Sequence, residues 1–126
     1  PGSMIGSDGI PGDRHPHPRL WVTFPRVLFK YSREMQLFPL EEAVYKMTGK
    51  SASVFGLEKR GIIDVGNYAD LVIFNPETVI DKASYQSPKL HADGIENVLV
   101  NGEVVWQEDS ATQNRPGMFL EGKKFH

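Results

Sequence analysis

Asp8 is the first residue whose type and setting could do chemistry. It follows the short apolar pair Met4-Ile5 and lies on a glycine-rich stretch that includes Gly6 and Gly9. A carboxylate just past a short strand is where a barrel or an α/β sheet places a metal ligand or a general base. Alternatively, Asp8 has only a structural role and stabilises a glycine-rich bend as an Asx-turn residue. Local spacing alone favours this second interpretation.

Arg19 and two histidines follow within a few residues. The guanidinium fork of Arg19 could bind a carboxylate in bidentate fashion, although a loop arginine is by default a solvated charge. His15 and His17 could ligate a metal from one face of a strand, but each precedes a proline, which favours a loop. We therefore expect both to be solvated or to cap loop carbonyls. His91 and His126 lie in polar contexts that indicate surface roles.

The elements that must position these residues begin with a loop and helices. Residues 1–18 are dense in glycine and proline and cannot sustain a helix or a ladder. Pro25 suits the first position of a helix, with Val27, Leu28 and Tyr31 at helical spacing after it. Pro39 opens a second helix with two glutamates in its first turn and a stripe of Leu40, Ala43, Val44 and Met47; Ser51 caps a third, 52–55, stopped by Gly56.

The apolar residues no longer follow helical spacing after Arg60, and the second half of the chain favours β-strands. The run 69–74 is apolar and predicts a buried strand. Asn101-Gly102 lies between the β-prone runs 95–100 and 103–106, which is the strongest short-range signal for a hairpin. The segment 81–94 is a long polar connection. We expect a boundary near Glu58, with a β portion too small to form an independent core.

Charge and composition exclude several functions. Fourteen basic and sixteen acidic residues give a net charge of −2, so no global field attracts nucleic acid or anionic lipid. No apolar run approaches the roughly 20 residues that cross a bilayer. The absence of cysteine excludes disulfides and thiolate zinc sites and agrees with a cytoplasmic location.

Several strings, taken together, resemble the N-acyl-D-amino-acid deacylases (D-aminoacylases) of the amidohydrolase superfamily. The loop strings are fairly specific to that branch, whereas the β strings mark only the superfamily. They are residues 4–9, 17–21, 23–28, 38–44 and 47–49, then 60–63, 66–74 and 100–106.

The resemblance implies a fold and a role for each part. Residues 1–58 would be the last strand, loop and helix of a (β/α)₈ barrel, and residues 59–126 part of the small β-sandwich domain. The intact enzyme would use zinc to hydrolyse the amide of N-acyl-D-amino acids. The residue matching Asp8 would touch the metal and act as general acid/base, and the one matching Arg19 would bind the substrate α-carboxylate.

Two departures from the family bear on this expectation. Val22 and Phe29 stand where the family usually has glycine, which affects loop geometry or the cleft. The family's histidine ligands are absent, and one carboxylate cannot hold zinc by itself. We therefore expect a piece of a longer chain that is inactive and binds no zinc tightly on its own, with the remainder of the barrel, or an oligomer, as its partner. Two alternatives stay open: a non-catalytic β-rich binding or assembly module, and a piece of another amidohydrolase, such as a hydantoinase-like enzyme.

Overall fold

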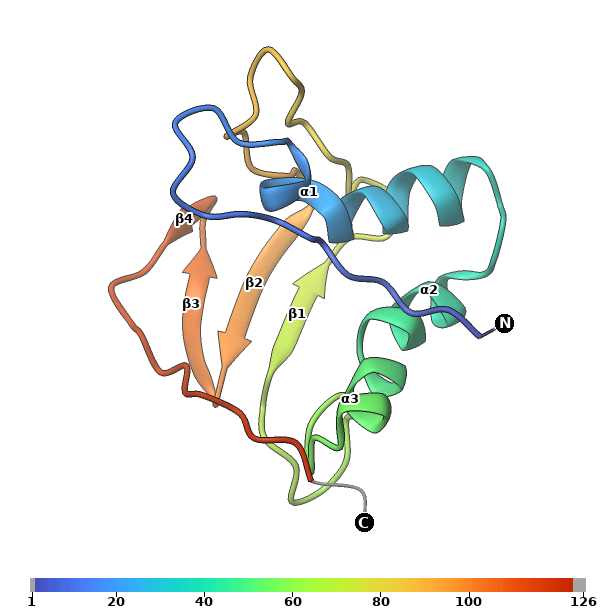
Figure 1. The fold of residues 1–126 in the computed structure, drawn as a ribbon, viewed down its shortest axis with the longest axis vertical. Helices are drawn as coiled ribbons and strands as arrows, with labels where there is room; N and C mark the ends of the chain where they lie inside the picture. Colours follow the sequence, from blue (N-terminus) through green and yellow to red (C-terminus); the bar gives the residue numbers. More distant parts are fainter. Residues whose placement is uncertain (1, 124–126) are drawn as a thin grey trace.

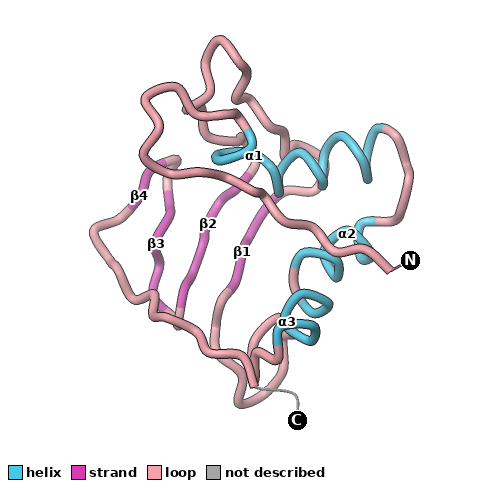
Figure 2. The backbone as a smooth tube through the Cα atoms, in the orientation of Figure 1, coloured by secondary structure: helices cyan, strands magenta, loops and turns pink. Residues whose placement is uncertain are grey.

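A computed structural model describes residues 2–123. Helices occupy the first half of the chain and strands the second half (Figure 1). The four strands form one sheet, and α1 crosses beyond one end of it while α2 and α3 lie along its side. The tube in Figure 2 shows that long loops make up much of the remainder, including the whole of the stretch before α1.

The first helix, α1 (Arg19–Arg26), continues directly into a π-helix, η1 (Val27–Glu34). The prediction that Pro25 opens a helix is wrong, because Pro25 lies inside α1. Proline has no N–H and cannot donate to the carbonyl four residues before it. The hydrogen-bond spacing widens just after Pro25, and the N–H of Met35 donates to the carbonyl of Lys30 five residues earlier.

Two short helices follow, and their ends agree largely with the sequence. α2 (Leu40–Met47) begins after Pro39, as predicted, and carries Glu41 and Glu42 in its first turn. α3 (Gly49–Phe55) begins three residues earlier than expected, so Ser51 lies within it and its hydroxyl donates to the carbonyl of Lys46. Gly56 ends α3 at φ +65°, a left-handed conformation that costs glycine little.

The strands are β1 (Leu71–Phe74), β2 (Ile95–Val100), β3 (Glu103–Gln107) and β4 (Ser110–Ala111). They pair antiparallel in the order β1-β2-β3-β4. The predicted hairpin is confirmed: Asn101 and Gly102 have φ values of +49° and +81° between β2 and β3. Two positive φ values are what a two-residue turn needs to match the twist of its strands.

A single buried cluster joins the two halves of the chain. It consists of Val27, Leu28, Ala43 and Val79. The predicted stripe of α2, together with Phe74 and Ile95, packs around it. The expectation of a buried β1 is wrong, because Val72 and Ile73 are each about half exposed (53% and 49%). Nothing in the described chain covers that part of the sheet.

The expected barrel strand has no partner in the described part of the chain. Met4 and Ile5 belong to no strand, and the N–H of Ile5 donates to the carbonyl of Lys46 in α2. A parallel barrel strand needs neighbours on both edges, and all described strand pairs are antiparallel. None of the helices between residues 2 and 123 is long and apolar enough to cross a membrane.

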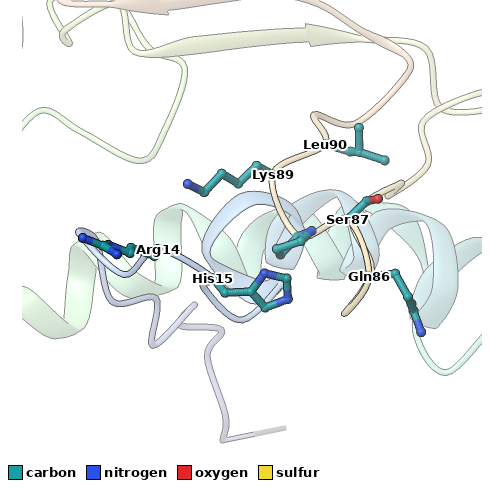
Figure 3. A pocket seen from close by; sticks show the side chains of 7 residues that line it. Arg14, His15, Gln86, Ser87, Lys89 and Leu90 are labelled. Carbon is teal, nitrogen blue, oxygen red and sulfur yellow. The ribbon is translucent and has the colours of Figure 1, made fainter.

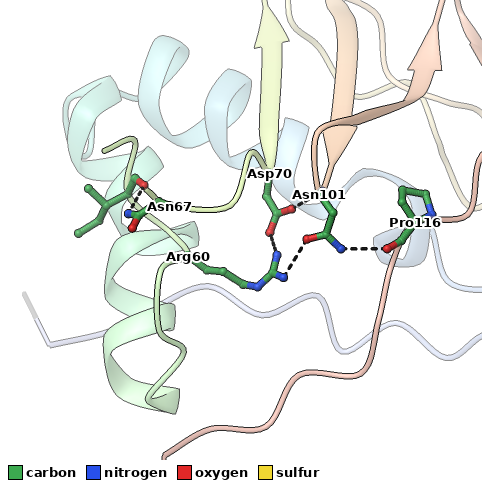
Figure 4. A network of polar contacts seen from close by, with 6 residues as sticks. Arg60, Asn67, Asp70, Asn101 and Pro116 are labelled. Atoms are coloured by element: carbon green, nitrogen blue, oxygen red, sulfur yellow. Dashed lines mark hydrogen bonds and ion pairs between the residues drawn. The ribbon is translucent and has the colours of Figure 1, made fainter. Parts of the chain in front are cut away.

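A polar network ties the connection after α3 to the hairpin (Figure 4). The guanidinium of Arg60 bonds the carboxylate of Asp70 and, at 2.8 Å, the side-chain oxygen of Asn101. The N–H of Asn101 donates back to Asp70 at 2.8 Å, and its side-chain amide donates to the carbonyl of Pro116 at 2.9 Å. Arg60 is 8% exposed, so these contacts satisfy a nearly buried charge.

Candidate active site

Asp8 lies on the loop before α1 in a conformation that aspartate adopts more readily than most residues. Its φ is +49°, in the left-handed region. Next to it the N–H of Gly9 donates to the hydroxyl of Ser7 at 3.3 Å. The side chain of Asp8 is 85% exposed. A strained backbone that presents an exposed carboxylate is typical of a functional loop.

Gly9 lets this loop approach the start of α1. A Cβ atom at Gly9 would lie 2.8 Å from the Cδ1 atom of Leu20 and 3.0 Å from its Cα atom. Real side chains do not tolerate such contacts without displacement of a neighbour, and the second contact is with backbone. The absence of a side chain at Gly9 therefore brings Asp8 within reach of Arg19, the residue before Leu20.

Arg19 is the first residue of α1, and its guanidinium faces Asp8. Its Nη2 atom lies 3.1 Å from Oδ2 of Asp8. The Nε atom is buried and has no hydrogen-bond partner among residues 2–123. The structure thus brings together the two residues that the sequence suggested for chemistry. An ion pair this exposed contributes at most about 1 kcal/mol, so stability does not account for it.

A cavity of about 630 Å³ opens beside this pair. Its walls come from the N-terminal loop, from one face of α1 and η1, and from the connection 81–86, and they include Ser7, Arg19, Val22 and Tyr85. Small-molecule sites have volumes of this order, with mostly apolar walls and a few polar groups. The arrangement can hold an organic anion whose charged end reaches Arg19.

A second ion pair, Arg26–Asp81, also lines this cavity. Nη1 of Arg26 lies 2.8 Å from Oδ2 of Asp81, whose side chain is only 6% exposed. The hydrogen bond to Asp81 raises the pKa of Arg26, against the opposing effect of burial. Arg26 is thus paired with a nearly buried carboxylate, whereas Arg19 is paired with the exposed carboxylate of Asp8, from which a ligand in this cavity can more easily displace it.

Both histidines of the loop contact Tyr85, which lies 68 residues beyond His17. Nε2 of His17 lies 2.9 Å from the Tyr85 hydroxyl, and Nε2 of His15 lies 2.8 Å from the Tyr85 carbonyl. Figure 3 shows the loop carrying Arg14 and His15 beside the segment 86–90. His15 thus meets a loop carbonyl, as expected. Tyr85 was not predicted from the sequence, because nothing in the pattern of the polar connection 81–94 shows which of its residues contacts the N-terminal loop.

His91 is exposed, as predicted; its Nδ1 atom lies 3.0 Å from the carbonyl of Ala92, and its ring packs edge-on against Trp106 at 5.3 Å. His126 lies outside the described residues.

The described residues do not make a metal site by themselves. Between residues 2 and 123, no three side chains of histidine, aspartate or glutamate come together as ligands. His15 and His17 are engaged by Tyr85, and Asp8 offers a single carboxylate. Since a catalytic zinc needs about three protein ligands, this donor set does not fit a complete centre.

Val22 and Phe29 occupy helical positions. Neither has a positive φ, so the loop geometry is not disturbed by the absence of glycine there. Val22 is 2% exposed and lines the cavity beside Arg19. Phe29 lies under the guanidinium of Arg33, 5.0 Å from its ring centre. Only Val22 can therefore affect what the cavity accepts.

A sequence profile of the amidohydrolase family matches residues 3–106, which is most of the chain. The chain belongs to the amidohydrolase family. Among individual amidohydrolases, it is 55% identical over 118 residues to a D-aminoacylase of Alcaligenes xylosoxydans xylosoxydans, which covers 94% of this chain and 24% of that protein. The resemblance inferred from the sequence strings is confirmed.

Solved amidohydrolase structures agree with the sequence match. The crystal structure of a D-aminoacylase superposes with a TM-score of 0.91 at 56% identity, over 94% of this chain and 25% of that one. An N-acyl-D-glutamate deacylase from Bordetella bronchiseptica, complexed with zinc and a phosphonate inhibitor, superposes with a TM-score of 0.87 at 49% identity over the same shares. The chain spans about a quarter of the length of these relatives.

Proposed function

We propose that this chain supplies part of the active site of a metal-dependent deacylase that hydrolyses N-acyl-D-amino acids to a D-amino acid and a carboxylate. The observation that carries the proposal is the 3.1 Å contact between Asp8 and Arg19; Arg19 and Ser7, the neighbour of Asp8, line a cavity of about 630 Å³. The high identity to a D-aminoacylase supports the same substrate class.

Asp8 is the proposed general acid/base. Its carboxylate is exposed and is held on a strained loop, so it can accept a proton from the attacking water at one oxygen and release it to the leaving amine. As a hard oxygen donor it also suits one position of a metal centre whose remaining ligands lie outside these residues. Zinc bound there would act as a Lewis acid on the amide.

Arg19 is the proposed anchor for the substrate α-carboxylate. One of its donors faces Asp8, and its buried Nε has no other partner in the described chain. A carboxylate bound by two of these donors has a fixed orientation, which would present only one enantiomer correctly to the reacting centre. The pairing with Asp8 keeps the guanidinium in place until the substrate competes for it.

The domain division belongs to the same proposal. Residues 1–58 would be the closing segment of a (β/α)₈ barrel and residues 59–126 part of a small β-sandwich domain. The half-exposed residues Val72 and Ile73 support this division, because they leave a sheet surface for further structure to cover. A cytoplasmic location and an oligomeric assembly stay predictions.

A graft tests the function directly. The matched quarter of the Alcaligenes D-aminoacylase is replaced by this chain, and hydrolysis of N-acetyl-D-amino acids and their L-enantiomers is measured. We expect zinc-dependent hydrolysis of the D-enantiomers. Asp8→Asn should lower kcat by about 10²- to 10⁴-fold, and Arg19→Lys should raise KM by about tenfold or more.

Asp109→Asn is the matched control for Asp8→Asn. Asp109 is an exposed aspartate with φ +56°, so the substitution makes the same chemical change in the same backbone conformation, away from the cavity. Arg14→Ala serves for Arg19. A folded, zinc-loaded graft without activity would contradict the proposal and favour the non-catalytic module.

A further inference from the structure

Tyr85, on the connection 81–94, contacts His17, and the ring of His17 accepts a hydrogen bond from the first residue of α1. The backbone N–H of Arg19 donates to Nδ1 of His17 at 3.0 Å. Since a backbone N–H can only donate, Nδ1 must be the unprotonated nitrogen of a neutral ring. The ring proton is therefore on Nε2, which donates to the hydroxyl of Tyr85 at 2.9 Å.

The backbone around His17 limits where its ring can go. Pro18 restricts His17 to extended conformations, and the flanking Pro16 and Pro18 are both buried. The Tyr85 ring also meets the imidazole edge-on, with centroids 5.1 Å apart and planes at 82°. The imidazole is thus held by chain stiffness on one side and by Tyr85 on the other.

Tyr85 is itself fixed at both ends of its own segment. The Arg26–Asp81 ion pair anchors the chain four residues before it, and Nε2 of His15 contacts its carbonyl. Tyr85 also lies inside a turn closed by the N–H of Ser84, which donates to the carbonyl of Ser87 at 3.1 Å. The hydroxyl of Tyr85 therefore occupies a defined point beside the cavity.

We infer that Tyr85 is a positioning residue: through His17 it fixes the first turn of α1 and so the direction in which Arg19 holds the substrate carboxylate. This inference rests on the proposed function for the identity of the ligand, whereas the hydrogen-bond chain Tyr85–His17–Arg19 stands on its geometry. Tyr85, from the second half of the chain, thus acts through His17 on an arginine that belongs to the first half.

Kinetics in the graft test the inference. Tyr85→Phe removes only the hydroxyl and should raise KM for the N-acetyl-D-amino acid about three- to tenfold, the worth of one neutral hydrogen bond, with kcat within twofold. His17→Asn retains an acceptor for the Arg19 N–H and should stay closer to wild type than His17→Ala. The control is Tyr45→Phe, an exposed tyrosine on α2, which should change neither constant.

A double-mutant cycle tests whether Tyr85 acts through His17. If it does, Tyr85→Phe has no further effect on KM in the His17→Ala background. Full additivity of the two changes would overturn the relay, as would a KM for Tyr85→Phe within twofold of wild type.

Hydrogen exchange separates this inference from the proposed function. In the 126-residue chain, the amide of Arg19 should exchange at least threefold faster in Tyr85→Phe, while the amide of Val98 in β2 keeps its rate. This readout needs no activity, so an inactive graft with accelerated Arg19 exchange would sink the deacylase proposal and retain the positioning role. An unchanged Arg19 rate overturns the positioning role whatever the graft does.

Discussion

The carboxylate of Asp8 and the guanidinium of Arg19 face each other across 3.1 Å at the edge of a cavity, although eleven positions separate them along a loop rich in glycine and proline. Their meeting depends on a close approach at Gly9 and on the helix start at Arg19. It places the proposed acid/base group and the proposed carboxylate anchor within one hydrogen-bond length of each other.

Asp8→Asn should separate function from stability. Because Asp8 is 85% exposed, losing its ion pair should change the free energy of unfolding by no more than about 1 kcal/mol. Urea unfolding of the 126-residue chain measures this against Asp109→Asn. A loss well above that value would mean that Asp8 supports the fold, as the Asx-turn interpretation requires.

Gly9→Ala should lower both the stability of the chain and the kcat of the graft. The new Cβ would meet the backbone of Leu20 at 3.0 Å, so the loop has to move away from α1 and carry Asp8 with it. We expect a loss of about 1–3 kcal/mol in stability and a fall in kcat of the graft. Gly117→Ala, where no atom lies within 4 Å of the new Cβ, is the control. Wild-type kinetics in Gly9→Ala would contradict the role given to this approach.

Removing Arg26 should lower the free energy of unfolding more than removing its partner Asp81. Arg26→Met leaves the carboxylate of Asp81, 6% exposed, without a charge partner and should cost about 3 kcal/mol. Asp81→Asn leaves a half-exposed guanidinium that can turn to water, so it should cost less. Chemical denaturation of both variants and of the double variant measures the difference. Equal losses would show that the two side chains are equally buried in solution.

Zinc should bind this chain only weakly. No three candidate ligands converge between residues 2 and 123, so Asp8 belongs to no group of three ligands there. Equilibrium dialysis with metal analysis should find well under one zinc per chain at micromolar zinc, and Asp8→Asn should not alter that value. Stoichiometric zinc would refute the view that the remaining ligands lie elsewhere.

Local signals predicted the elements whose geometry is decided locally. Asn101-Gly102 requires two positive φ values, Gly56 ends α3 in the left-handed region, and Pro39 with Glu41 marks the start of α2. In each case the residue types limit the backbone whatever surrounds them. The strings that resemble deacylases pointed to Asp8 and Arg19, which lie in contact, while their roles stay predictions.

Contacts between distant residues could not be predicted in this way. The N–H of Arg19, the first residue of α1, donates to the ring of His17, and His17 contacts Tyr85, 68 residues away. The apolar run around Val72 indicated a buried strand, yet burial depends on what covers the sheet. Trp21 and Phe24 are likewise nearly half exposed in the described chain. The local sequence pattern shows neither which distant residue contacts His17 nor what packs against β1.

The return of the C-terminal segment to α3 has a consequence for limited proteolysis. The N–H of Lys123 donates to the carbonyl of Gly56 at 3.0 Å, and Pro116 is tied to Asn101. The stretch holding Ile63 and Val65, 88% and 99% exposed, is the most open part of the connection between α3 and β1. A single cut there should give two bands under denaturing conditions but one peak in gel filtration. The two pieces would still share the buried cluster of Val27, Leu28, Ala43 and Val79 and the hydrogen bond between Lys123 and Gly56.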